Sequence, residues 1–106
     1  MIAKTTEPPY FAVIFTSLRK ETEPEEYHFM AEKMLELAHS QPGFLGYESA
    51  RNEVGITVSY WTDTESIRKW KSHSEHLTAQ QNGRKKWYES YKVRVCKVER
   101  DYGFEG

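Results

Sequence analysis

The chain has 106 residues, with 15 Lys and Arg against 16 Asp and Glu, so its formal net charge is −1 with neutral histidines. This length suits a single domain, and the near-zero charge gives no general attraction to nucleic acid. A mean hydropathy of −0.81, with no long apolar run, offers no candidate for a membrane-spanning helix.

Residues 1–9 are expected to form a flexible lead-in, because the pair Pro8-Pro9 cannot join the interior of a sheet. This segment also lacks the apolar core of a signal peptide. The single cysteine, Cys96, can form neither an internal disulfide nor a multi-thiolate zinc site. We therefore expect a cytoplasmic protein whose domain spans residues 10–106, with Cys96 as an inert buried thiol.

Residues 10–18 are predicted to form a strand that is apolar on both faces. The two faces carry Phe11, Val13 and Phe15 on one side, and Tyr10, Ala12 and Ile14 on the other. A strand with two apolar faces needs cover on both of them. Helices can supply one cover, so the other predicts a second subunit and hence a homodimer.

The next helix is expected to begin near Pro24, a residue favoured in first helical turns, and to run to His39. Pro42 and Gly43 then stop it. Residues 44–50 are predicted to form a second strand, followed by a hairpin connection over residues 51–55. Residues 56–61 form the third strand, because β-branched and aromatic residues alternate there.

Residues 62–65 fit a capping box, which predicts that a helix begins there and docks Ile67 and Trp70 on the sheet. His73 and His76 follow Trp70 at the same helical spacing. Ser74 and Glu75 resemble a new cap, so a third helix is expected over residues 76–88. Valines alternate with charged residues over 91–98, which predicts a fourth strand at an edge of the sheet.

The predicted order is therefore β-α-β-β-α-α-β. Right-handed crossovers on this order give an α+β fold, the ferredoxin-like split β-α-β unit, with a four-stranded antiparallel sheet and helices on one face. The other face is too apolar to remain in water, and two such sheets packed face to face would cover it.

Four motifs together resemble the antibiotic biosynthesis monooxygenase family: QPGFLG at 41–46, ITVSYW at 56–61, IRKW at 67–70 and SEH at 74–76. The resemblance covers about the whole chain after Pro9. It implies a dimeric α+β barrel with a pocket in each subunit, between the helices and the sheet. The family it resembles includes cofactor-independent oxygenases of polyketide phenols, quinol oxygenases, haem-degrading monooxygenases and members with no known reaction.

The candidate catalytic residues are His76, His73 and Trp70. An imidazole in a first helical turn is held neutral by the helix dipole, so His76 could accept a phenolic proton. A tryptophan such as Trp70 is more often simply a core residue at a helix–sheet contact, and both roles can hold at once. The candidate substrate-binding residues are aromatic: Tyr47, Tyr60, Trp61 and Phe15.

No metal site is expected, because His73 and His76 lack a third ligand. The family that the chain resembles has a haem-degrading branch, and Trp70 matches the tryptophan that this branch uses on its second helix. The positions of that branch's asparagine and histidine ligand fall near Thr16 and Gln80, so haem is the minority interpretation. The basic run Arg84-Lys85-Lys86 is expected to be a solvated helix end and not a nucleic-acid site.

These observations predict a cofactor-independent monooxygenase acting on a small phenol-like or quinol-like aromatic compound. Two alternatives remain open. The same barrel could be a non-catalytic small-molecule-binding or stress-related protein, or it could degrade haem.

Overall fold

The computed structural model describes residues 2–21, 24–80 and 87–105. Its elements, in chain order, are β1 (Tyr10–Arg19), α1 (Pro24–His39), β2 (Phe44–Arg51), β3 (Gly55–Trp61), α2 (Thr64–Gln80) and β4 (Tyr88–Val98). The strands form one sheet in the order β2-β3-β1-β4, and each neighbouring pair is antiparallel. The predicted α+β ferredoxin-like fold with a four-stranded antiparallel sheet is confirmed.

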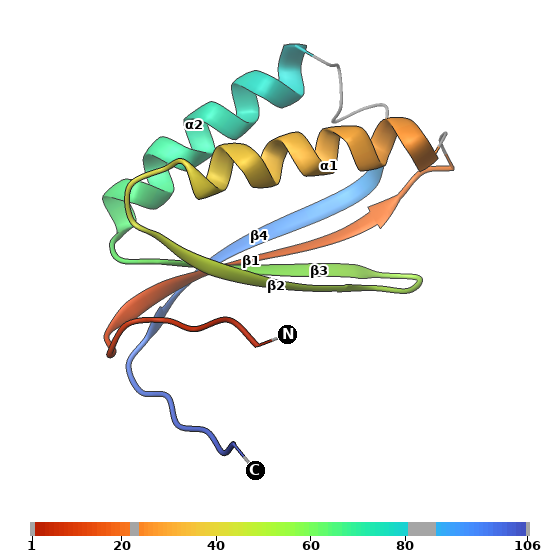
Figure 1. Cartoon of the computed structure of the whole chain (residues 1–106). Helices are drawn as coiled ribbons and strands as arrows, with labels where there is room; N and C mark the ends of the chain where they lie inside the picture. The colour runs from red at the N-terminus through yellow and green to blue at the C-terminus, as the bar shows by residue number, and fades with distance from the viewer. Residues whose placement is uncertain (1, 22–23, 81–86, 106) are drawn as a thin grey trace.

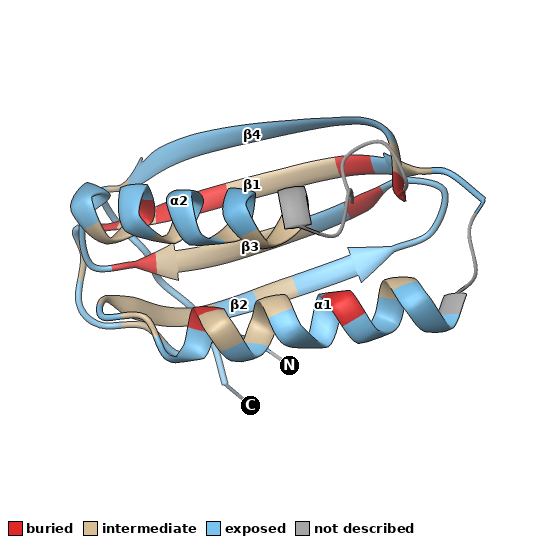
Figure 2. Ribbon diagram, turned by 90° about the horizontal axis from the view of Figure 1, so that it is seen from above, coloured by how far each residue is buried: buried red, intermediate tan, exposed pale blue. Residues whose placement is uncertain are grey.

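Both helices lie on one side of the sheet, and both chain ends lie on the other side (Figure 1). Seen from above, α2 lies over the middle of the sheet and α1 runs along β2, while the edge strand β4 extends outside the helix layer (Figure 2). Within the described ranges, neither helix is long and apolar enough to cross a membrane. We call the two sides of the sheet the helix side and the open side.

The core sits on the helix side, where Val13, Trp61 and Ile67 pack together. Trp61 is fully buried, and its ring stacks on that of Trp70 at 6.0 Å with an interplanar angle of 26°. Burying side chains such as Val13 and Ile67 stabilises the fold by about 1.5–3 kcal/mol each. This cluster ties the start of α2 to the central strands.

The prediction of two helices after β3 is wrong, because α2 continues through Ser74 and Glu75. The Ser74 hydroxyl donates to the Lys71 carbonyl at 3.0 Å, a bond within the helix and not a cap. Lys71 and Glu75 form an ion pair at 3.8 Å with the i,i+4 spacing that supports a continuous helix. The fourth strand, β4, starts at Tyr88, three residues earlier than predicted. Residues 81–86, which include the basic run, lie outside the described residues.

The helix start was predicted at the right place, but the capping residue is Asp63 and not Thr62. The Asp63 carboxylate accepts the Ser66 backbone N–H at 2.7 Å, which is the N-cap geometry. That hydrogen bond lowers the pKa of Asp63. Glu65, the expected partner in a capping box, instead pairs with Arg68.

The open side leaves apolar side chains uncovered in a single chain, including Leu18 and Ile56 at 40% and 45% exposure. Cys96 also lies on the open side. It is the register partner of Ala12, whose other partner, Tyr60, precedes the helix-side residue Trp61 and so faces the opposite way. Its thiol is exposed, so the prediction of a buried cysteine is wrong for the single chain. Cys96 is exposed because β4 is an edge strand that none of the described helices and strands covers on this side.

Candidate functional site

The predicted catalytic residues all lie on α2, but they do not meet at one point. Trp70 is half-buried against Trp61, whereas His73 and His76 are exposed. The argument that placed His76 in a first helical turn is wrong, because residue 76 lies in the last turns of α2. The helix-dipole argument for His76 as a proton acceptor therefore does not apply.

The predicted substrate-binding residues divide between the two sides of the sheet. Phe15, Tyr47 and Trp61 lie on the helix side, where Phe15 contacts Tyr88 at 5.5 Å between ring centroids. Tyr60 lies on the open side, so the structure does not bring it to the same surface as the other residues. Phe15 and Tyr47 could therefore both contribute to a site between the helices and the sheet. Trp61 is buried and packs against Trp70.

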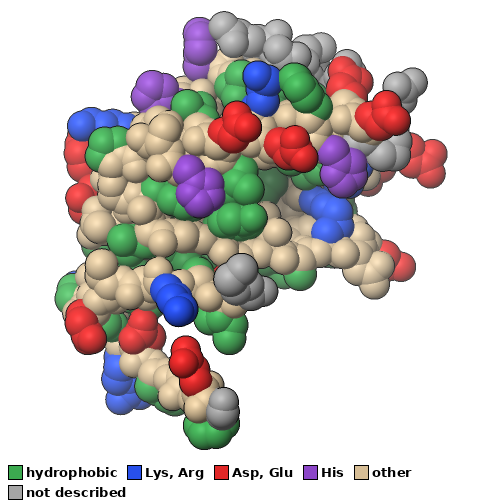
Figure 3. Space-filling model, in the orientation of Figure 1, with side chains coloured by type: hydrophobic (Ala, Val, Ile, Leu, Met, Phe, Trp, Pro, Cys, Tyr) green, Lys and Arg blue, Asp and Glu red, His purple; other side chains and the backbone are tan. Residues whose placement is uncertain are grey.

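A pocket of about 720 Å³ opens at the end of the sheet, where β1 ends and the hairpin joins β2 to β3. Its lining is polar and mostly charged, and comprises Arg19, Lys20, Glu21, Arg51, Asn52 and Glu53. The surface is hollowed between the helix layer and the sheet, with cationic side chains in the hollow (Figure 3). A volume of this size accommodates a small organic molecule.

Arg19 and Arg51 are pocket residues that the sequence analysis did not single out. Both meet the ring of Tyr27 on α1, with guanidinium carbons 3.8 Å and 5.9 Å from its centroid. The position of Arg51 follows from the strand register. Arg51 pairs with Gly55 across a short hairpin, and Gly55 pairs with Ser17, so Arg51 lies close to Ser17 on the helix side. A charged loop and a hairpin arginine do not reveal that relationship when each is considered alone.

A group of aromatic rings continues from this pocket into the sheet. Tyr27 contacts Tyr88 at 6.3 Å, and Tyr88 contacts Tyr91 at 5.6 Å and Phe15 at 5.5 Å. Burial and the neighbouring Tyr27 raise the pKa of Tyr88, so its hydroxyl stays protonated at neutral pH. Trp87 contacts Tyr27 at 6.3 Å, and its buried Nε1 has no acceptor within the described residues.

The open side carries a second, smaller pocket of about 310 Å³ between the two chain ends. Two tyrosine–carboxylate hydrogen bonds line it: Tyr10 donates to Asp101 at 2.5 Å and Tyr60 donates to Glu48 at 2.6 Å. Burial and the Glu48 bond raise the pKa of Tyr60 to about 12. The Asp101 bond likewise raises the pKa of Tyr10, so both hydroxyls stay protonated at neutral pH.

Across the described parts of the chain, no three His, Cys, Asp or Glu side chains are close enough together to hold a metal ion. Thr16, the position matched to the haem branch's asparagine, pairs with Ile56 and lies on the open side, away from Trp70. The side chain of Gln80 lies outside the described residues. Thr16 and Trp70 therefore cannot contact one haem from the same side of the sheet.

The model of the antibiotic biosynthesis monooxygenase family matches residues 9–82. The chain is 51% identical over 106 residues to the uncharacterized protein YqjZ of Bacillus subtilis, covering 98% of this chain and 92% of that protein. Among solved structures it is similar to SnoaB, a cofactor-independent oxygenase from Streptomyces nogalater. That match has 13% identity and a TM-score of 0.71, over 89% of this chain and 97% of SnoaB.

A conserved protein from Methanosarcina mazei shares the same fold, with 12% identity and a TM-score of 0.70 over 83% of this chain and 91% of that one. At such identities the structural likeness shows the fold alone. The family match and the Bacillus relative go further, because they cover most of the sequence itself. The chain belongs to the antibiotic biosynthesis monooxygenase family.

Proposed function

We propose that this protein is a cytoplasmic, cofactor-independent monooxygenase that oxidises a small phenol-like or quinol-like aromatic compound. Two observations carry the proposal: membership of the monooxygenase family, and an open pocket on the helix side. Two arginines of the pocket lining contact Tyr27, which belongs to a group of aromatic rings. SnoaB, which shares the fold, is a cofactor-independent oxygenase, and this supports the absence of a resident cofactor.

The proposed reaction begins when the bound phenol loses its proton. The electron-rich ring carbon of the phenolate then reduces oxygen and forms a carbon–oxygen bond. The resulting peroxide takes up a proton, and loss of water from the hydroperoxide leaves a quinone. Overall, one phenol and one oxygen molecule give one quinone and one water.

The chain's contribution in this proposal is to bind the ring, to keep water away and to hold the phenolic proton. His76 and His73 on α2 are the proposed acid–base residues, and Trp70, which stacks on Trp61, is the proposed aromatic residue of the same helix. Phe15 and Tyr47 supply ring contacts on the helix side, where Tyr47 also meets His39 at 6.2 Å. Trp61 packs behind Trp70 in the core, and Tyr60 lies on the opposite face of the same strand.

A homodimer is part of the proposal. The open side carries a run of apolar side chains on the two central strands, Ile14 and Leu18 on β1 with Ile56 and Val58 on β3. A second copy that packs its own open side on this surface would remove these side chains from water. Dimerisation would also cover Cys96.

Oxygen consumption by the purified full-length protein tests the enzyme proposal. We expect oxygen uptake with naphthols or hydroquinones, one water formed per quinone, and a loss of about 10²–10⁴-fold in turnover for His76→Ala. His28→Ala, an exposed histidine on α1, is the matched control and should retain activity. Ligand binding without oxygen uptake across the panel would support the non-catalytic alternative instead.

A further inference from the structure

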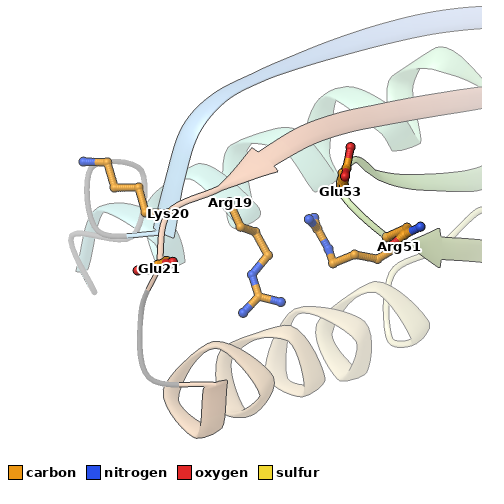
Figure 4. A pocket seen from close by; sticks show the side chains of 6 residues that line it. Arg19, Lys20, Glu21, Arg51 and Glu53 are labelled. Carbon is orange, nitrogen blue, oxygen red and sulfur yellow. The ribbon is translucent and has the colours of Figure 1, made fainter.

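Two arginines from different strands converge on one tyrosine ring. Arg19 ends β1 and Arg51 ends β2, and their guanidinium carbons lie 3.8 Å and 5.9 Å from the centroid of Tyr27 on α1. Figure 4 shows both side chains reaching into the space between α1 and the sheet. The fold therefore gathers two positively charged residues of the pocket lining around one aromatic ring of α1.

The position of Arg51 is built by its neighbours. Its Nη2 donates a hydrogen bond of 2.6 Å to the hydroxyl of Ser17, which is only 2% exposed. The guanidinium lies over Gly55, where a Cβ atom would overlap it. A buried hydroxyl, a glycine and a ring thus orient a long side chain that would otherwise sample many rotamers.

The pocket lining carries more positive than negative charge, and neither Arg19 nor Arg51 forms an ion pair with another described residue. The lining holds three cations (Arg19, Lys20 and Arg51) and two carboxylates (Glu21 and Glu53), so 3 − 2 leaves one positive charge. The ion pairs found between described residues involve neither arginine. In Figure 4 Glu53 points away from both guanidinium groups. Bringing two cations together, with no carboxylate partner among the residues that the structure describes, costs electrostatic energy, which a bound anion would offset.

An aromatic surface adjoins the two cations. Tyr27, which both arginines meet, contacts Tyr88 and Trp87, and Tyr88 contacts Phe15 further into the sheet. Rings of this kind bind another ring by stacking or by edge contacts. The pocket volume of about 720 Å³ leaves room for a ligand of two or three fused rings.

We infer that Arg19 and Arg51 bind the carboxylate of an aromatic carboxylic acid, with its ring directed toward Tyr27 and Tyr88. A planar guanidinium presents paired N–H donors that match the two oxygens of a carboxylate. This inference rests on the proposed function for its substrate class, since it makes the phenol-like substrate an aromatic acid. The binding itself needs no reaction with oxygen.

Calorimetric titration under nitrogen separates binding from turnover. The probes are a hydroxynaphthoate and the matching hydroxynaphthamide, which share the ring system and differ in charge. We expect the native protein to bind the carboxylate at least about 10-fold more tightly than the amide, as a charge-assisted hydrogen-bond pair provides. Arg19→Gln and Arg51→Gln should each remove most of that preference.

Two further variants act as controls. Gly55→Ala keeps every charge but displaces the Arg51 guanidinium, so it should also weaken carboxylate binding relative to the amide. Arg68→Gln removes a cation of α2 that pairs with Glu65, and the preference should stay unchanged. Circular dichroism and thermal melting establish that each variant is folded before its binding is compared.

Equal affinity of the native protein for the carboxylate and the amide would overturn the inference, and so would the lack of binding by both. A preference that survives in the Arg19→Gln/Arg51→Gln double variant would overturn it as well. Oxygen uptake distinguishes the two proposals. A carboxylate preference without uptake leaves this inference standing and removes the oxygenase. Oxygen uptake with neutral phenols, without a carboxylate preference, supports the oxygenase and overturns this inference.

Discussion

The Tyr60 hydroxyl donates a hydrogen bond of 2.6 Å to Oε1 of Glu48, and Oε2 of the same carboxylate accepts the backbone N–H of Ala3 at 2.9 Å. One side chain of β2 therefore joins the neighbouring strand β3 to the amino-terminal segment. The pair also shifts two titrations in opposite directions. Burial and Glu48 raise the pKa of Tyr60 to about 12, while the bonds from Tyr60 and Ala3 lower the pKa of Glu48.

This pair predicts a defined pH range of greatest stability. The Tyr60 contribution is complete below its ordinary pKa of 10.0 and is lost as the pH rises through about 12. The Glu48 contribution is complete above its ordinary pKa of 4.5 and is lost as the pH falls through its lowered value. Tyr60→Phe should lower the unfolding free energy at pH 7 by about 1 kcal/mol and should reduce the acid and alkaline dependence.

Urea unfolding at a series of pH values measures this effect. Tyr102→Phe is the matched control, because Tyr102 is 88% exposed and should leave both the stability and its pH profile unchanged. A Tyr60→Phe profile that coincides with that of the native protein at every pH would contradict the prediction.

The cap of α2 can be tested by comparing two adjacent residues. Asp63→Ala removes the carboxylate that accepts the Ser66 N–H, and we expect the unfolding free energy to fall by about 1 kcal/mol. Thr62→Ala removes a hydroxyl that only donates to Asp63 at 3.1 Å, so its effect should be about 0.5 kcal/mol or less. Chemical denaturation of both variants gives the comparison, and a larger loss for Thr62→Ala would contradict the assignment of the cap.

Gly43 occupies a position that a side chain cannot share. Its φ is +88°, and a Cβ atom there would lie 2.7 Å from Cβ of Ser66 and 2.8 Å from Oγ1 of Thr62. Gly43→Ala should therefore destabilise the fold by about 1–3 kcal/mol, through backbone strain and the displaced start of α2. Gly103→Ala, whose Cβ meets no atom within 4 Å, should be neutral in the same thermal melting experiment.

The proposed dimer predicts that a charge on the open side will separate the subunits. Ile56→Lys places an ammonium group on a central strand, where burial against a second copy would be costly, and should weaken association at least about 10-fold. Val54→Lys, in the turn between β2 and β3, has a similar native exposure of 43% and should remain dimeric. Sedimentation velocity at micromolar concentration measures both variants. A native chain that sediments as a folded monomer would remove the dimer proposal.

Much of the fold could be predicted from local patterns. β1 is a continuous apolar run, β3 and β4 alternate with period two, and each helix has a recognisable start. The exception was the end of α2. Ser74 and Glu75 have the composition of a cap, but in the structure they make bonds within a continuous helix, from Ser74 to Lys71 and from Glu75 to Lys71. A residue that can cap a helix can also sit inside one, and only the neighbouring turn decides between the two roles.

The candidate site was harder to predict than the fold. Trp70 was correctly expected to pack on the sheet, because its position follows from helical spacing. The placement of Arg19 and Arg51 around Tyr27 depends on three elements meeting in space. No local pattern carries that information, since it requires the register of β2 on β3 and of β3 on β1.

The two chain ends are attached to the same surface. Glu48 holds the amino-terminal segment at Ala3, and Tyr10 holds the carboxyl-terminal segment at Asp101, both on the open side (Figure 1). A purification tag fused to either end is therefore carried beside the sheet face that a second copy would cover. Tag removal before any measurement of self-association, or a tag inserted in the turn near Val54, keeps that face clear.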